Sequence, residues 1–194
     1  MKKLVIKTIS ITLASLIGAM LLVFCALVLF APGYVGGVFD GAGNYSASVF
    51  FYEKQYEKTG SVKDLNTLVL KLDIDKDTEK AEKFYCEIIN HADFDKLCQD
   101  NSSQDKVISE KEYYYGNYTL ALAKNGKFSQ ALSFAKEKCA QQYSAFAPMR
   151  VLIYDYLTAE NKEELVLVAQ ALGELNVSSN YINIDLAYVQ SLLN

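Results

Sequence analysis

The feature that most limits the fold of this chain is a long uncharged run near its N-terminus. No charged residue lies between Lys7 and Asp40, and the 24 residues from Thr8 to Ala31 are predominantly apolar. As a helix this run is about 36 Å long at ~1.5 Å per residue, enough to cross the ~30 Å hydrocarbon core of a bilayer. We therefore predict a cytosolic tip and transmembrane anchor over residues 1–31.

A cleaved signal peptide is the alternative reading of the same run. The apolar core of a signal peptide has ~7–15 residues and is followed by small residues at the cleavage site. This run is longer, and Ala31 is followed by Pro32 and preceded two positions back by Leu29, where a small residue is expected. The pattern favours an anchor that stays in the membrane.

Lysines are distributed unequally about the run. Lys2, Lys3 and Lys7 precede it, whereas the next basic residue is Lys54. The positive-inside rule then places the N-terminus in the cytosol and the rest of the chain outside it. We expect a single-pass protein of the cell membrane with an extracytoplasmic domain.

Small residues recur every four positions within the run, at Ser10, Ala14 and Gly18. This spacing places them on one helix face and lets two membrane helices approach closely. The face is therefore a candidate for helix packing. The alternative is that membrane helices are rich in small residues in any case.

Residues 32–43 read PGYVGGVFDGAG, with five glycines in 12 residues. That composition predicts a flexible tether with an end-to-end span of about 19 Å. Tyr34 and Phe39 suit the headgroup region as interfacial aromatics. Residues 44–194 then form the soluble domain.

The soluble domain is acidic, with 16 basic and 22 acidic side chains in residues 44–194. A nucleic-acid-binding protein needs a basic face to contact phosphates. The sequence shows no such face, so we expect no nucleic-acid partner.

Apolar residues of this domain recur three and four apart, which predicts an all-α domain. Gly60 and Gly126 are placed to end helices, Ser61 and Asn161 to begin them, and Pro148 suits a first helical turn.

The helical segments repeat. Four anchor positions lie 32, 34 and 34 residues apart, at Leu65, Leu97, Ala131 and Leu165. The positions nine, thirteen and sixteen residues before each anchor are all apolar or aromatic: Tyr56, Ile88, Leu122 and Tyr156; Tyr52, Phe84, Tyr118 and Leu152; Val49, Ala81, Tyr115 and Met149.

A helix-turn-helix unit of about 34 residues resembles the tetratricopeptide repeat. The third unit matches best, through Tyr115, Tyr118, Gly126, Phe128 and Ala131. The small residue that this family has twelve before the anchor is replaced by Glu53, Tyr85, Thr119 and Ile153. The resemblance implies an α-solenoid of about four helical hairpins with a closing helix over residues 179–193.

The resemblance also implies a concave groove lined by the first helix of each hairpin, and plain solvated surface is the alternative. The candidate groove residues are Phe50, Lys54, Glu79, Glu82, Cys86, Tyr113, Arg150 and Tyr154.

The closing helix carries two apolar stripes and one charge, Asp185. The fourth hairpin has one open end to cover, so a single stripe is enough to dock the closing helix on it. That stripe consists of Ile182, Leu186, Val189 and Leu193. The second is a candidate contact strip, or is buried in a groove: Tyr181, Ile184, Tyr188 and Leu192.

Reactive residues are sparse. His91 is the only histidine, which excludes a multi-histidine metal site. Cys86 and Cys98 either pair in a disulfide or stay as buried thiols. We expect no enzyme and no cofactor.

The sequence as a whole favours a membrane-tethered module that binds an unidentified protein near the membrane. The alternative is an accessory subunit of a membrane complex that acts through its transmembrane helix.

Overall fold

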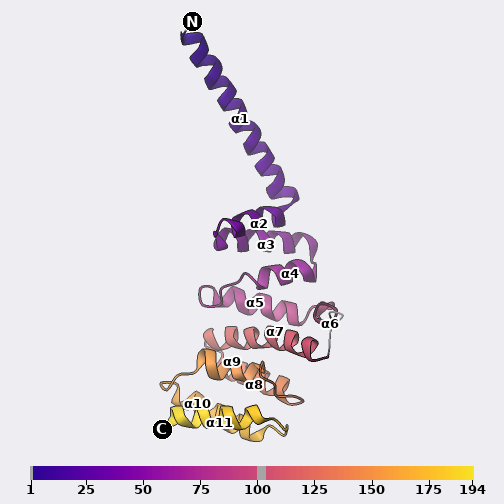
Figure 1. The fold of residues 1–194 in the computed structure, drawn as a ribbon, viewed down its shortest axis with the longest axis vertical. Helices are drawn as coiled ribbons and strands as arrows, with labels where there is room; N and C mark the ends of the chain where they lie inside the picture. Colours follow the sequence, from indigo (N-terminus) through magenta and orange to yellow (C-terminus); the bar gives the residue numbers. More distant parts are fainter. Residues whose placement is uncertain (1, 100–103) are drawn as a thin grey trace. The chain divides into compact units, whose positions relative to one another are not determined.

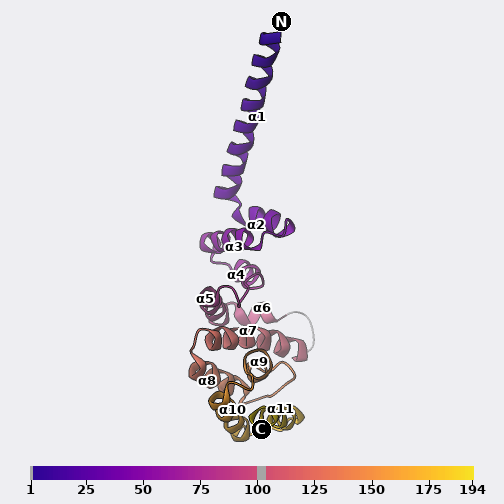
Figure 2. The same cartoon turned by 90° about the vertical axis from the view of Figure 1, so that its left-hand side faces the viewer.

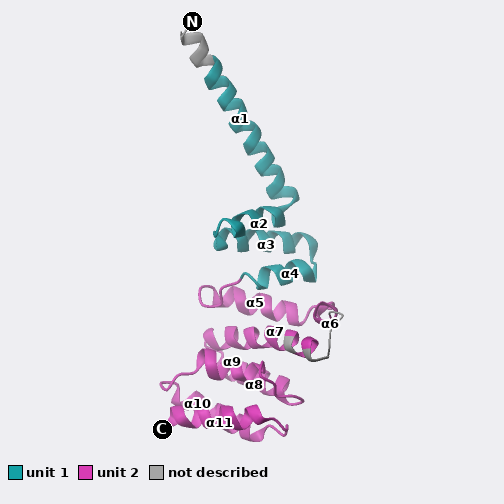
Figure 3. Cartoon of the chain, viewed as in Figure 1, with its two compact units in different colours: residues 1–71 teal, residues 72–194 magenta. Residues whose placement is uncertain are grey.

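The structure is a computed structural model that describes residues 2–99 and 104–194, with the side chains of residues 8–99, 106–108 and 110–194. Every regular element in these ranges is a helix (Figures 1 and 2), which confirms the all-helical prediction. The chain divides into two compact units, Met1–Lys71 and Leu72–Asn194 (Figure 3), and each is described by itself.

Unit 1 begins with helix α1 (Lys2–Phe30). Its segment Thr8–Phe30 is 23 residues long and none of it is buried within the protein. By length and composition it suits a membrane anchor or a signal sequence. Ser10 and Ala14 are exposed, and a Cβ added at Gly18 would meet nothing within 4 Å. The candidate packing face is therefore uncovered.

The expected flexible tether is instead a helix, α2 (Pro32–Gly41), which packs against α3 (Tyr45–Thr59). A Cβ at Gly36 would lie 3.1 Å from the ring of Tyr52, and one at Gly33 would lie 3.1 Å from the Gln55 side chain. The Gly33 N–H also donates to Gln55 Oε1 at 3.2 Å. The glycines therefore allow close helix packing, which outweighs their low helix propensity.

Local signals set the end of α3 and the start of α4 (Val62–Val69) as the sequence predicts. Gly60 ends α3 with a left-handed backbone, φ +61°, a conformation open to glycine at little cost. The Ser61 side chain then accepts from the Lys63 N–H and begins α4. The anchor residue Leu65 of α4 is fully buried.

Unit 2 is organised around the long helix α7 (Gln104–Lys124). It packs against α5 (Thr78–Ile89), the short α6 (Phe94–Cys98), α8 (Phe128–Cys139) and α9 (Pro148–Val151). Gly126, with φ +73°, forms the turn from α7 to α8. Ala131 of α8 is fully buried.

The C-terminal part consists of α9, a single turn of π-helix η1 (Leu152–Tyr156), α10 (Lys162–Glu174) and α11 (Asn180–Leu193). Pro148 occupies the first turn of α9, as predicted. The closing helix is present, and the Ser179 side chain caps it by accepting from the Tyr181 N–H. Val189 of α11 is fully buried in this core.

The repeat positions are all withdrawn from solvent. Each of the four anchors and the twelve positions before them is buried or half-buried. This pattern fits paired helices, while a repeat of the tetratricopeptide type stays a prediction.

The four cysteines, Cys25, Cys86, Cys98 and Cys139, are free thiols. Cys98 is fully buried, and burial raises the pKa of its thiol to about 11. Cys98 is therefore a buried thiol and Cys86 a half-buried one, and the structure contains no disulfide between these two residues.

Gly116→Ala should destabilise unit 2, because its Cβ would lie 2.7 Å from Val151 Cγ2 and would force α7 and α9 apart. We expect a loss of about 1–3 kcal/mol. Gly173→Ala in α10 is the matched control, since nothing lies within 4 Å of its Cβ. That change should stabilise the helix by about 0.5–1 kcal/mol. Urea unfolding of the full chain in detergent, followed by circular dichroism, compares them. Equal stability of the two variants would contradict the close contact.

Candidate functional site

An acidic side chain lies on the buried side of α7. Glu112 is 7% exposed, and the Ser144 hydroxyl donates to its Oε2 at 2.6 Å. Ser144 itself accepts from the Phe146 N–H at 2.9 Å, which orients the hydroxyl. Burial raises the pKa of the Glu112 carboxyl, and the hydrogen bond from Ser144 acts in the opposite direction.

A second acidic side chain is buried on α11. Asp185 is fully buried, and its two oxygens accept from the hydroxyls of Tyr143 and Tyr154, each at 2.7 Å. Arg150 Nε lies 3.5 Å from Asp185 Oδ2 and balances the charge. We call these four residues the Asp185 cluster. Burial, followed by the hydrogen bond to Asp185, raises the pKa values of both tyrosines.

The Arg150 side chain is held between aromatic rings. Its guanidinium carbon lies 4.6 Å from the centre of the Tyr181 ring and 5.3 Å from that of Tyr154. The side chain is 18% exposed, yet its Nη1 is buried without a hydrogen-bond partner. A buried guanidinium nitrogen of this kind costs free energy unless another group accepts from it.

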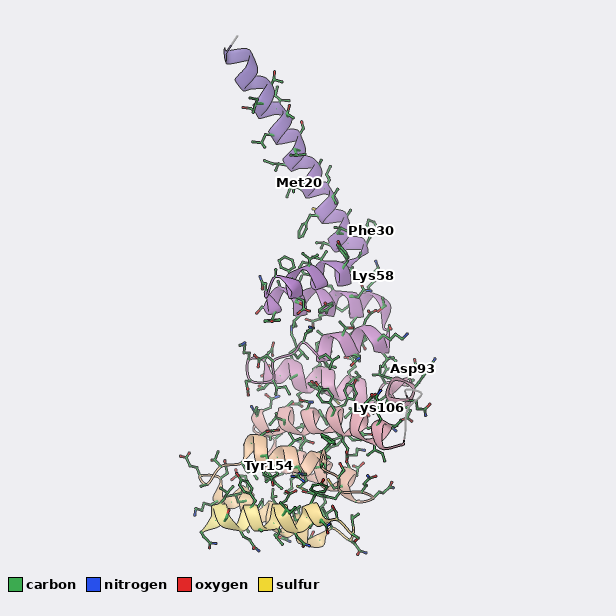
Figure 4. All side chains as sticks on the ribbon, in the orientation of Figure 1. Met20, Phe30, Lys58, Asp93, Lys106 and Tyr154 are labelled. Carbon is green, nitrogen blue, oxygen red and sulfur yellow. The ribbon has the colours of Figure 1, made fainter. Side chains whose placement is uncertain are left out.

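The backbone of η1 places Tyr154. The Leu157 N–H donates to the Leu152 carbonyl at 3.0 Å, five residues back, which makes this turn wider than an α-helix. Such single π-turns occur frequently at functional sites. Here the turn carries Tyr154 (Figure 4), whose hydroxyl reaches Asp185 on α11.

Glu112, Arg150 and Tyr154 meet at an open cavity of about 400 Å³ between α7, the 140–147 loop, α9 and η1. The polar and aromatic lining residues are Glu112, Tyr113, Asn117, Phe146, Arg150, Tyr154 and Asp155. Two carboxyls, a guanidinium and an amide lie among aromatic rings, so the cavity can exchange hydrogen bonds with a polar ligand and also pack against its apolar parts.

The structure brings only part of the predicted groove together. Tyr113, Arg150 and Tyr154 line the cavity. Glu79 and Glu82 line a different hollow, where Glu82 pairs with Lys127 at 2.7 Å.

The other groove candidates lie outside both hollows. Cys86 is half-buried on α5. Phe50 and Lys54 belong to unit 1, where Lys54 pairs with Glu57 at 2.6 Å and its Nζ lies 5.9 Å from the centre of the Phe50 ring.

The candidate strip on α11 is partly engaged. Tyr181, Ile184 and Tyr188 are exposed, whereas Leu192 packs against the core. Tyr188 stacks on Tyr154 with ring centres 5.0 Å apart, and Tyr181 lies against Arg150. The strip therefore contacts the Asp185 cluster.

Sequence reasoning missed Glu112, Tyr143 and the role of Asp185. Asp185 was visible as the lone charge of an apolar helix, and a lone charge among apolar residues is a signal of a buried ionic contact. Glu112 gave no signal, because glutamate is common on exposed helix faces.

Within the described ranges, no group of three or more histidine, cysteine, aspartate or glutamate side chains is placed to hold a metal ion. The chain matches no protein-family model, no curated protein and no solved structure.

Glu112→Gln should raise stability at neutral pH. The pKa of this carboxyl is higher in the folded protein than in the unfolded chain, so the folded state holds the proton more tightly. The stabilising contribution of the Glu112 carboxyl is therefore present below its pKa in the unfolded chain, and it is lost as the pH rises through its pKa in the folded protein.

Urea unfolding from about pH 4 to pH 8, on either side of an ordinary carboxyl pKa, measures this difference. Glu137→Gln is the control, because that side chain is 69% exposed. The interpretation fails if the wild type gains stability relative to Glu112→Gln as the pH rises.

Proposed function

We propose that this chain is a membrane-tethered helical module that binds a protein partner outside the cytosol. Helix α1 is the anchor, and the cavity of unit 2 is the binding site. One observation carries the binding role: the cavity is lined by a buried carboxyl, Glu112, and by the guanidinium-bearing side chain of Arg150, with aromatic rings around them. The Glu112 carboxyl accepts a hydrogen bond from Ser144, and its remaining acceptor capacity gains from a bound polar group.

The rim of the cavity favours a protein as the ligand. Tyr113, Phe146 and Tyr154 are 44%, 62% and 43% exposed around it. Tyrosine, phenylalanine and arginine are enriched at protein interfaces, and tyrosine and arginine carry much of the binding energy there. A volume of about 400 Å³ accommodates one or two side chains of a bound segment.

The tetratricopeptide-like repeat is part of the same proposal. The four hairpins would be α3 with α4, α5 with α6, α7 with α8, and α9–η1 with α10, and α11 would close the series. In such repeats the first helices line the binding groove. The cavity lies between α7 and α9–η1, the first helices of the third and fourth hairpins, which supports this assignment.

The orientation rests on the lysines. Three lysines, Lys2, Lys3 and Lys7, precede the apolar segment Thr8–Phe30 of α1, and no basic residue lies between Lys7 and Lys54. The positive-inside rule then favours the extracytoplasmic side of the cell membrane for the part of the chain that follows α1.

A photo-crosslinking residue in place of Tyr113 should capture the partner in native membranes. Glu112→Gln in the same chain should reduce the yield several-fold, because it removes a charge that the partner contacts while the fold is retained. The control is the crosslinker at Val166, which is 54% exposed on α10 and does not line the cavity. Equal capture from Val166, unchanged by Glu112→Gln, would instead favour the membrane helix as the important surface.

A membrane-impermeant amine reagent applied to intact cells should label Lys54, whose side chain is 49% exposed. Lys2 and Lys3, which precede the apolar segment of α1, should stay protected until the membrane is opened. Mass spectrometry of the digested protein locates the label. Protection of Lys54 in intact cells would refute the proposed orientation.

A further inference from the structure

Helix α2 has two different faces. Val35 and Gly36 are buried, and the ring of Phe39 stacks on Phe51 of α3 with centres 5.4 Å apart. The opposite face exposes Tyr34, Gly37, Val38 and Gly41, which are three and four residues apart and form one stripe. Tyr34 is 65% exposed and Val38 is 56% exposed.

The exposed stripe of α2 carries no charge. The only charged residue of α2 is Asp40, and its side chain is 22% exposed. Lys71 Nζ lies 2.7 Å from Asp40 Oδ2, and this hydrogen bond raises the pKa of the lysine. The ion pair compensates the charge of Asp40, so nothing on this helix opposes contact with an apolar surface.

The stripe faces the side of unit 1 from which α1 leaves. Both views show α2 between the end of α1 and helix α3 (Figures 1 and 2), and α3 covers the opposite face of α2. One hydrogen bond joins α3 to the end of α1: Lys58 Nζ donates to the Phe30 carbonyl at 2.7 Å.

The chain length sets how far α2 can lie from the membrane. One residue, Ala31, separates α1 from α2. The two steps along the chain from Phe30 to Pro32 span at most about 7 Å, which is comparable to the thickness of the headgroup layer on one side of the hydrocarbon core. If α1 crosses the bilayer, α2 therefore begins within the headgroup layer.

We propose that α2 is an interfacial helix that rests its uncharged stripe on lipid, with Tyr34 and Val38 in the headgroup region of the leaflet where α1 ends. This inference rests on the proposed role of α1 as an anchor. Tyrosine favours this region because its ring is apolar and its hydroxyl is polar. The occupant of the stripe is the bilayer, because the span that leads into α2 leaves no room for a protein between them.

The chain contains no tryptophan, so a single introduced tryptophan is a unique fluorescent reporter. The variants are Tyr34→Trp on the stripe, Met20→Trp within α1 (Figure 4) and Phe146→Trp in unit 2. Phe146 is 62% exposed, which matches the exposure of Tyr34. Each full-length variant is reconstituted into phosphatidylcholine vesicles whose acyl chains carry bromine, a quencher, either near the headgroup or deep in the bilayer.

We expect bromine near the headgroup to quench Tyr34→Trp, deep bromine to quench Met20→Trp, and neither to quench Phe146→Trp. Val38→Trp is a second reporter on the stripe and should behave like Tyr34→Trp. Circular dichroism identical to that of the wild type establishes that each variant is folded.

Other outcomes separate the two levels of the proposal. Quenching of Met20→Trp without quenching at Tyr34 or Val38 would overturn the interfacial helix and leave the anchor in place. Absence of quenching at all these positions would overturn the anchor and the interfacial helix together. Equal quenching of Phe146→Trp and Tyr34→Trp would also overturn the inference, because contact with lipid would then not be a property of the stripe.

Discussion

The buried carboxylate of Asp185 is the interaction on which the C-terminal part of unit 2 depends. Moving a carboxylate out of water costs several kcal/mol unless charged and hydrogen-bonding groups replace the water. Tyr143, Arg150 and Tyr154 supply that replacement from three different segments. Because all three must reach one carboxylate, the cluster fixes the register of α11 against α9, η1 and the 140–147 loop. The same contacts hold Arg150 and Tyr154 in the wall of the cavity.

The sequence predicted those parts of the fold that depend on local chemistry. Gly60 and Ser61 end one helix and begin the next through conformations and hydrogen bonds confined to a few residues. The uncharged run and the buried repeat positions were also visible, because helix periodicity shows directly in the sequence.

Contacts between distant residues could not be predicted in this way. Tyr143 and Tyr154 lie 42 and 31 residues before Asp185, and no local pattern links them. Helix α2 illustrates the same limit. Its glycines indicated a flexible tether, because the tyrosine ring that packs on Gly36 belongs to another helix. Three of the groove candidates meet at the cavity, while their neighbour Glu112 was missed because its burial depends on the loop that covers it.

Close backbone contact and costly polar burial occur together at the cavity. Gly116 allows α9 to approach α7 so closely that a single added methyl group would collide with Val151. That approach makes Glu112 of α7 and Arg150 of α9 walls of one cavity. Stability alone does not favour this arrangement, because burial raises the pKa of Glu112 and Arg150 Nη1 is buried without a partner. Polar groups kept at a cost to folding are characteristic of binding sites. That cost is therefore the physical argument behind the proposed binding role of unit 2.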